Sequence, residues 1–265
     1  MRHLPLFSFL FLLLVGCTAT SPDDIAASGS VEQAVSRQTP TSDFQKRAKI
    51  HTELGMVYLY EGRYEVALEE ARIAIEADGG YAPAYNLRAL TYMALLKNDL
   101  AEESFRQALG MARGDPEINN DYGWFLCQSG RPKESIAYFR VAIGNPLFKS
   151  PGKALTNAGL CSLANRDDRQ AEEFLLRAYR GDRKNATALY WLADIAYRGN
   201  RFADARQRID DLHALVEPRA ATAWLALRIE RKLGNRDGEA RYMGILSRKY
   251  RDSDEYMKMS RGEFE

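Results

Sequence analysis

The sequence has few of the side chains on which enzymes and metal sites depend. It holds three histidines, His3, His51 and His213, and three cysteines. His213 has no cysteine or histidine at metal-ligand spacing, and the chain contains no HExxH, GxSxG, P-loop or CxxC motif. Adjacent carboxylates such as Glu102 and Glu103 point in different directions on a helix. We therefore expect no catalytic residue, metal, cofactor or small-molecule substrate, and interpret the protein as a non-enzyme.

An excess of either charge is also missing. The chain has 37 basic and 36 acidic residues, and no long basic stripe interrupts this balance. Because nucleic-acid binding depends on clustered lysine and arginine, nucleic acid is not an expected partner.

Only one long apolar run is present, from Leu4 to Val15, after a short basic start at Arg2 and His3. As a helix it would span roughly 18 Å, well short of the roughly 30 Å hydrocarbon core of a bilayer. The run is therefore interpreted as part of a signal peptide, residues 1–16, and not as a membrane-spanning helix.

The end of this run, Leu14-Val15-Gly16-Cys17, resembles the lipobox of bacterial lipoproteins. The resemblance implies cleavage before Cys17 and attachment of lipid to its sulfur, so that several acyl chains anchor the protein in a membrane. Thr18 follows where retained inner-membrane lipoproteins carry aspartate, which implies sorting to the outer membrane, facing the periplasm. Residues 17–42, rich in Ser, Thr, Ala and Asp, are expected to form a flexible tether to a folded domain over residues 43–265.

Small residues recur along the folded domain at a nearly constant spacing of 34 residues, with one step of 36. One series is Gly55, Ala89, Gly123, Gly159 and Ala193, and another is Ala67, Ala101, Ser135, Ala171 and Ala205. Two antiparallel helices can cross closely only where side chains are small. The pattern resembles the tetratricopeptide repeat, a helix-turn-helix unit of 34 residues whose copies stack into a superhelical solenoid.

This resemblance implies an all-α solenoid of six units, at about 48–81, 82–115, 116–151, 152–185, 186–220 and 221–254. Turn residues such as Gly62 and Gly130 fall between the two expected helices of a unit. The sixth unit carries Arg228 and Arg231 at positions that are small or aromatic elsewhere, as expected of a capping repeat. Residues 257–265 are expected to be a helical extension or a frayed tail.

In the tetratricopeptide family, positions two, five, nine, twelve and thirteen of each first helix line the concave groove. In the first three units these positions are mostly apolar, which suits an amphipathic helix or an extended peptide with apolar anchors. Two asparagines among them are expected to hold a peptide backbone. The predicted partner-binding residues are Met56, Leu59, Tyr60, Asn86, Leu90, Met93, Asn120 and Trp124. Unit five presents a wetter surface, with Tyr190, Asp194, Tyr197 and Arg198.

Lipobox, tether and six repeats together resemble the type IV pilus biogenesis and stability lipoproteins, the PilF/PilW family. The most specific matches are the segments Asn119–Cys127, Asn145–Leu147 and Asn157–Cys161. The resemblance implies a pilotin that binds the pilus secretin and assists its outer-membrane localisation or multimerisation. Two alternatives stay open, a repeat lipoprotein of outer-membrane protein assembly and a scaffold for cell-wall enzymes.

Cys127 and Cys161 remain as a pair once Cys17 is assigned to lipid. They fall at similar depth in the first helices of units three and four, whose axes should lie about 8–10 Å apart. That spacing permits the Cα separation of about 4.4–6.8 Å that a disulfide needs, and export would supply oxidising conditions. A disulfide is the preferred interpretation, and two reduced packing thiols are the alternative.

Overall fold

The computed structural model describes residues 33–264, and within this range the chain forms helices without strands. The predicted signal peptide, residues 1–16, and the predicted lipid-attachment residue Cys17 lie outside the described residues. No helix in the described range is both long and apolar enough to cross a bilayer.

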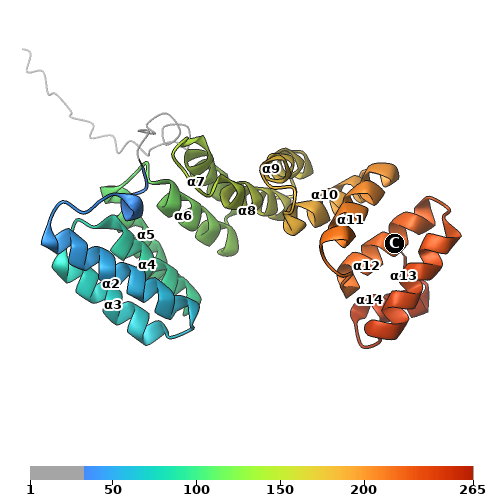
Figure 1. Cartoon of the computed structure of the whole chain (residues 1–265), viewed down its shortest axis with the longest axis horizontal. Coiled ribbons are helices and arrows are strands. Elements are labelled where there is room, and N and C mark those ends of the chain that lie inside the picture. The colour runs from blue at the N-terminus through green and yellow to red at the C-terminus, as the bar shows by residue number, and fades with distance from the viewer. Residues whose placement is uncertain (1–32, 265) are drawn as a thin grey trace, which may run out of the picture.

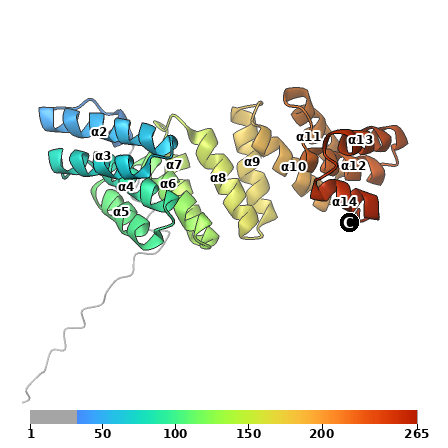
Figure 2. The same ribbon diagram turned by 90° about the horizontal axis from the view of Figure 1, so that it is seen from below.

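The helices form six successive pairs along an elongated solenoid (Figures 1 and 2). The first helices of the pairs are α2 (Asp43–Tyr60), α4 (Ala82–Ala94), α6 (Pro116–Gln128), α8 (Pro151–Ala164), α10 (Ala186–Arg198) and α12 (Ala220–Lys232). The second helices are α3 (Tyr64–Ala77), α5 (Asn98–Met111), α7 (Pro132–Gly144), α9 (Asp168–Gly181), α11 (Phe202–Leu215) and α13 (Arg236–Lys249). The predicted all-α tetratricopeptide solenoid is confirmed.

The recurring small residues lie where helices cross, either within a pair or between neighbouring units. A Cβ atom added to Gly159 would stand 2.6 Å from Leu175 Cγ on the second helix of the same unit. At Gly55 the added atom would stand 2.4 Å from Leu87 Cδ2 of the next unit. The 34-residue spacing of small residues therefore records the crossing points of the helices.

Each helix pair turns through a residue with positive φ. Glycine fills this position in units one, three and six, at Gly62, Gly130 and Gly234. In the other units the residues are Leu96, Arg166 and Asn200, with φ near 58°. The hairpin turns are thus geometrically alike although their residues differ.

The end of the predicted tether packs against the repeats. Residues Val35–Arg37 form a short 3₁₀ helix, η1, and Ala34 before it is buried. Val35 N donates a hydrogen bond of 2.7 Å to Asp115 Oδ2, and Arg37 Nε pairs with Glu117 Oε1 at 2.8 Å. The prediction of a flexible tether up to residue 42 is therefore wrong for its last residues, because these contacts hold them at the start of α6.

The two ends of the solenoid differ. At the C-terminal end, α14 (Asp254–Arg261) packs on α12 and α13, and Met259 is buried there. The predicted tail after residue 256 is thus mainly part of a capping helix. At the other end, α2 exposes an apolar stripe whose equivalents in the inner units are covered by the preceding repeat: Ile50, Leu54 and Val57.

Candidate functional site

The first helices of units one to four enclose a groove. One cavity in it, of about 250 Å³, is lined by Met56, Leu59, Tyr60, Leu90, Asp121, Trp124, Lys153 and Asn157. A second cavity, of about 240 Å³, shares four of these residues and adds Arg37, Glu117, Asn120, Phe148 and Ser150. We call the two cavities together the unit 1–4 groove.

Six of the eight predicted partner-binding residues line this groove, and Asn86 and Met93 do not. Tyr60 is 80% exposed, whereas Leu90 and Met93 pack against the core cluster around Phe105. Met93 was placed in the groove because of its position in the repeat. In the structure Met93 packs against that cluster and lines neither cavity of the groove.

The asparagines are committed to a neighbour in the structure. Asn86 Nδ2 donates to Asp121 Oδ2 at 2.9 Å, and Asn120 Nδ2 donates to Asp121 Oδ1 at 3.0 Å. Asn157 Nδ2 in turn donates to Asn120 Oδ1 at 3.1 Å. Each amide nitrogen thus makes one hydrogen bond to Asp121, and both side chains are buried. That Asn86 and Asn120 hold a peptide backbone stays a prediction.

Asp121 is the centre of this polar network, and the position rule for the groove missed it. Asp121 and Asn157 are the sixth residues of their units, and the rule uses positions two, five, nine, twelve and thirteen. Burial raises the pKa of Asp121, while Lys153, whose Nζ lies 3.7 Å from Oδ1, and the amides of Asn86 and Asn120 oppose that shift. A half-exposed amide, Asn157, and an exposed cation, Lys153, are the polar groups that the network leaves at the groove surface.

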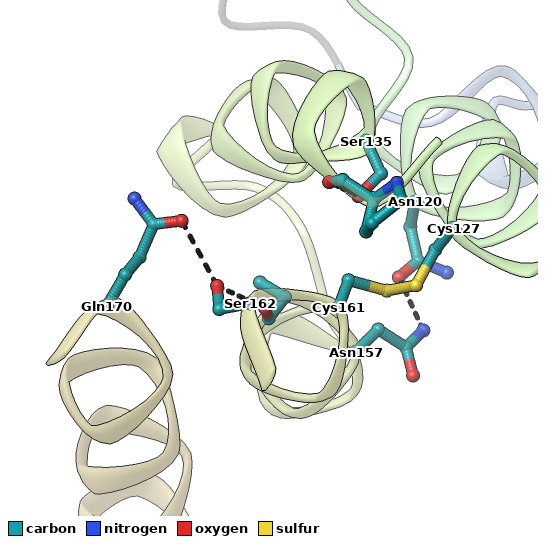
Figure 3. Close-up of a disulfide and its surroundings, with 9 residues drawn as sticks. Asn120, Cys127, Ser135, Asn157, Cys161, Ser162 and Gln170 are labelled. Atoms are coloured by element: carbon teal, nitrogen blue, oxygen red, sulfur yellow. Dashed lines mark hydrogen bonds between the residues drawn. A yellow bond between two sulfur atoms is a disulfide. The ribbon is translucent and has the colours of Figure 1, made fainter. Parts of the chain in front are cut away.

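Cys127 and Cys161 are joined by a disulfide in the structure, with a Cα–Cα separation of 5.7 Å (Figure 3). The bond links α6 to α8, beside the hydrogen bond between Asn120 and Asn157. Trp124 lies one turn before Cys127 and lines the groove. The disulfide therefore ties together two helices of the groove wall, and no free thiol faces the groove at this point.

The described histidines have structural partners. His51 Nδ1 lies 2.6 Å from Glu70 Oε2, which links α2 to α3. His213 contacts Tyr242 and Thr222, and burial lowers its pKa to about 4. Within residues 33–264 no group of three or more His, Cys, Asp or Glu side chains is arranged to hold a metal ion.

Comparison with known proteins places these features in context. The profile of the tetratricopeptide repeat family matches residues 86–154 and 162–214. The type IV pilus assembly protein PilF of Pseudomonas aeruginosa is 27% identical over 252 residues, covering 95% of this chain and 96% of that protein.

Two solved structures are similar along most of their length. The crystal structure of PilW, described as a widely conserved type IV pilus biogenesis factor, is 32% identical with a TM-score of 0.73. The match covers 80% of this chain and 98% of PilW. The structure of Pseudomonas aeruginosa PilF is 27% identical with a TM-score of 0.77, covering 83% of this chain and all of that chain.

Proposed function

This chain belongs to the PilF/PilW family of tetratricopeptide-repeat type IV pilus biogenesis factors, and from that premise we propose that it is a pilotin. In this proposal Cys17 carries lipid that anchors the protein in the outer membrane, facing the periplasm. The solenoid binds the pilus secretin, and the complex promotes secretin localisation or multimerisation. The protein acts by binding and not by catalysis.

The observation that carries the binding proposal is the composition of the unit 1–4 groove. Met56 and Leu59 line it while half-buried, and neither belongs to a buried core cluster, so part of their apolar surface is open to a partner. Exposed Tyr60 and half-buried Trp124 add aromatic surface, and both residue types are frequent at the centres of protein interfaces. Such a groove fits an apolar segment of a partner protein.

Docking of η1 fixes where the described part of the tether lies relative to the groove. Because Val35 is bonded to Asp115, the tether leaves the folded domain beside the start of α6, and Arg37 forms part of the groove wall. A partner in the groove would therefore lie next to the point where the tether begins.

The anchoring part is tested with Cys17→Ser. We expect this variant to leave the outer-membrane fraction and to reduce the amount of multimeric secretin there. A variant that still fractionates with the outer membrane and supports secretin multimers contradicts lipid anchoring as the mechanism.

The binding part is tested with Leu59→Asp, in the groove, and with Leu100→Asp as the matched control. Leu100 on α5 is an exposed leucine that belongs to no core cluster and lies outside the unit 1–4 groove. We expect Leu59→Asp to weaken capture of the secretin at least tenfold and to leave thermal unfolding near wild type. If detergent-solubilised partners are instead barrel-assembly factors or cell-wall hydrolases, the secretin proposal is wrong.

A further inference from the structure

A separate cavity of about 820 Å³ lies between α8 and α10, larger than either cavity of the unit 1–4 groove. Neighbouring first helices pack on one another elsewhere in the solenoid, but the contact between α8 and α10 is weaker than at any other such pair. The cavity shares no lining residue with the unit 1–4 groove. Its lining residues are Leu160, Leu163, Ala164, Arg166, Asp168, Trp191, Asp194 and Arg198.

The walls of this cavity are apolar and rigidly held. Leu160 and Leu163 on α8 face Trp191 on α10, and all three side chains are half-buried. The Trp191 ring packs edge-on against Tyr190, with centroids 5.1 Å apart and an interplanar angle of 76°. A fixed tryptophan beside leucines offers a large apolar contact to an inserted side chain at little cost in conformational entropy.

Of the charged side chains at the rim of the cavity, three pair with one another and one does not. Arg198 donates to Asp194 at 2.8 Å and also pairs with Asp168, so both carboxylates already have a cationic partner. Arg166 forms no ion pair or side-chain hydrogen bond with any residue in the described range. Its backbone is fixed by the hairpin turn, where Arg166 N donates to Leu163 O at 2.9 Å. The guanidinium of Arg166 is therefore available at the rim, and a guanidinium binds a carboxylate well.

We infer that this cavity, which we call the α8–α10 pocket, is a second peptide subsite. It takes a peptide segment with a large apolar side chain, such as phenylalanine or leucine, next to an aspartate or glutamate whose carboxylate is bound by Arg166. The inference rests on the proposed function and extends it: one partner chain can contact the solenoid at the unit 1–4 groove and again at the α8–α10 pocket. Two contacts on one rigid solenoid would strengthen binding more than either contact alone.

The direct test uses the chain from residue 17 with Cys17→Ser and the capped peptide Gly-Ser-Gly-Phe-Asp-Gly-Ser-Gly. In ¹⁵N NMR titrations we expect saturable shifts of the Trp191 indole N–H and of backbone amides in α8. Replacing the peptide phenylalanine by alanine, or introducing Leu160→Asp, should weaken binding at least tenfold. No saturable shift at Trp191 up to millimolar peptide, or shifts confined to Trp124, overturns the inference.

A charge exchange tests the role of Arg166. Arg166→Glu should weaken the Phe-Asp peptide at least fivefold and strengthen a Phe-Lys peptide of otherwise identical sequence. Arg140→Glu, at an exposed arginine of α7 outside the pocket lining, carries the same charge change and should alter neither affinity. If Arg166→Glu leaves the preference between the two peptides unchanged, the assigned carboxylate contact is wrong.

Failure of this inference is separable from failure of the proposed function. Leu59→Asp should weaken secretin capture at least tenfold while peptide shifts at Trp191 persist, because Leu59 does not line the α8–α10 pocket. Secretin capture without any peptide binding at Trp191 would overturn the second subsite and leave the proposed function intact. Peptide binding at Trp191 without secretin capture would support the second subsite and contradict the proposed function.

Discussion

His213 should make the stability of the C-terminal units depend on pH. The ring of this α11 residue lies between α12 and α13, with Nδ1 3.1 Å from the Tyr242 hydroxyl and Nε2 3.0 Å from Thr222 Oγ1. Burial lowers the pKa of His213 from 6.5 to about 4, and the nearby Arg241 adds to the shift. The folded state therefore prefers the neutral ring.

The sign of the effect follows from proton uptake. Between pH 6.5 and about pH 4 the unfolded chain binds a proton at this histidine and the folded chain does not, so the free energy of unfolding falls as the pH falls. A lowering of that size corresponds to about 3 kcal/mol at most, since one pKa unit is worth about 1.4 kcal/mol. Because the ring is only partly buried, water screens it and we expect a loss of about 2 kcal/mol.

The assay compares wild type with His213→Gln, whose amide can still donate and accept a hydrogen bond but does not ionise. Urea unfolding followed by circular dichroism at pH 7, 6, 5 and 4.5 gives the free energy of unfolding of each protein. Because repeats can unfold in parts, hydrogen exchange of α12 and α13 measures the local effect. Wild type should lose about 2 kcal/mol more than the variant on acidification. Parallel pH profiles would refute the assignment of a buried neutral His213.

Three further variants probe packing, covalent linkage and tether docking. Gly159→Ala should destabilise the fold by about 1–3 kcal/mol in thermal or urea unfolding, because the new methyl group meets Leu175. Removal of the disulfide by Cys127→Ser with Cys161→Ser, across a sequence separation of 34, should lower stability by about 3–4 kcal/mol on the chain-entropy model. Asp115→Ala should cost about 1–3 kcal/mol, because it removes the N-cap of α6 and the acceptor for η1, and it should speed proteolysis before residue 42.

Each of these variants has a matched control. Gly110→Ala adds a methyl group where no atom lies within 4 Å, so it should not destabilise the fold. Reducing agent should lower the stability of wild type and leave the double serine variant unchanged. Asp167→Ala removes the comparable N-cap of α9, which accepts from Gln170 N, and should not affect proteolysis of the tether. Equal proteolysis of the Asp115 and Asp167 variants would contradict the docking contact.

The hairpins could be predicted from sequence because their determinants recur at fixed positions. The small residues at the helix crossings and the residues at the turns repeat every 34 positions or so, and each acts on near neighbours in the chain. Reliance on the repeat pattern also placed the start of unit one too late, at about residue 48, whereas α2 begins at Asp43. Its signal is Ser42, whose side chain accepts from Gln45 N, and this N-cap has no counterpart in the repeat pattern.

Docking of η1 could not be predicted, because it depends on residues far apart in sequence. Val35 and Asp115 are separated by 80 positions, and composition alone marks the segment before residue 42 as poorly able to pack. One buried alanine, Ala34, and three hydrogen bonds to α6 suffice to hold it. Low hydrophobicity therefore predicts a weak tendency to fold alone, and not the absence of a docking site on an already folded surface.

The sequence predicted which residues face the concave side, but not how those residues bond to one another or how far apart the helices lie. The position rule identified Leu59 and Trp124 because every first helix turns the same positions inward. It also selected Asn86, which lines neither cavity of the unit 1–4 groove and gives one N–H of its amide to Asp121. The rule also places Leu160, Leu163 and Ala164 on the concave face, at positions nine, twelve and thirteen of unit four. It gave no sign that α8 and α10 diverge there, since divergence between two first helices arises from packing over several units. Binding subsites on a repeat solenoid therefore depend on how the units diverge, so two chains with the same inward-facing residues can recognise different partners.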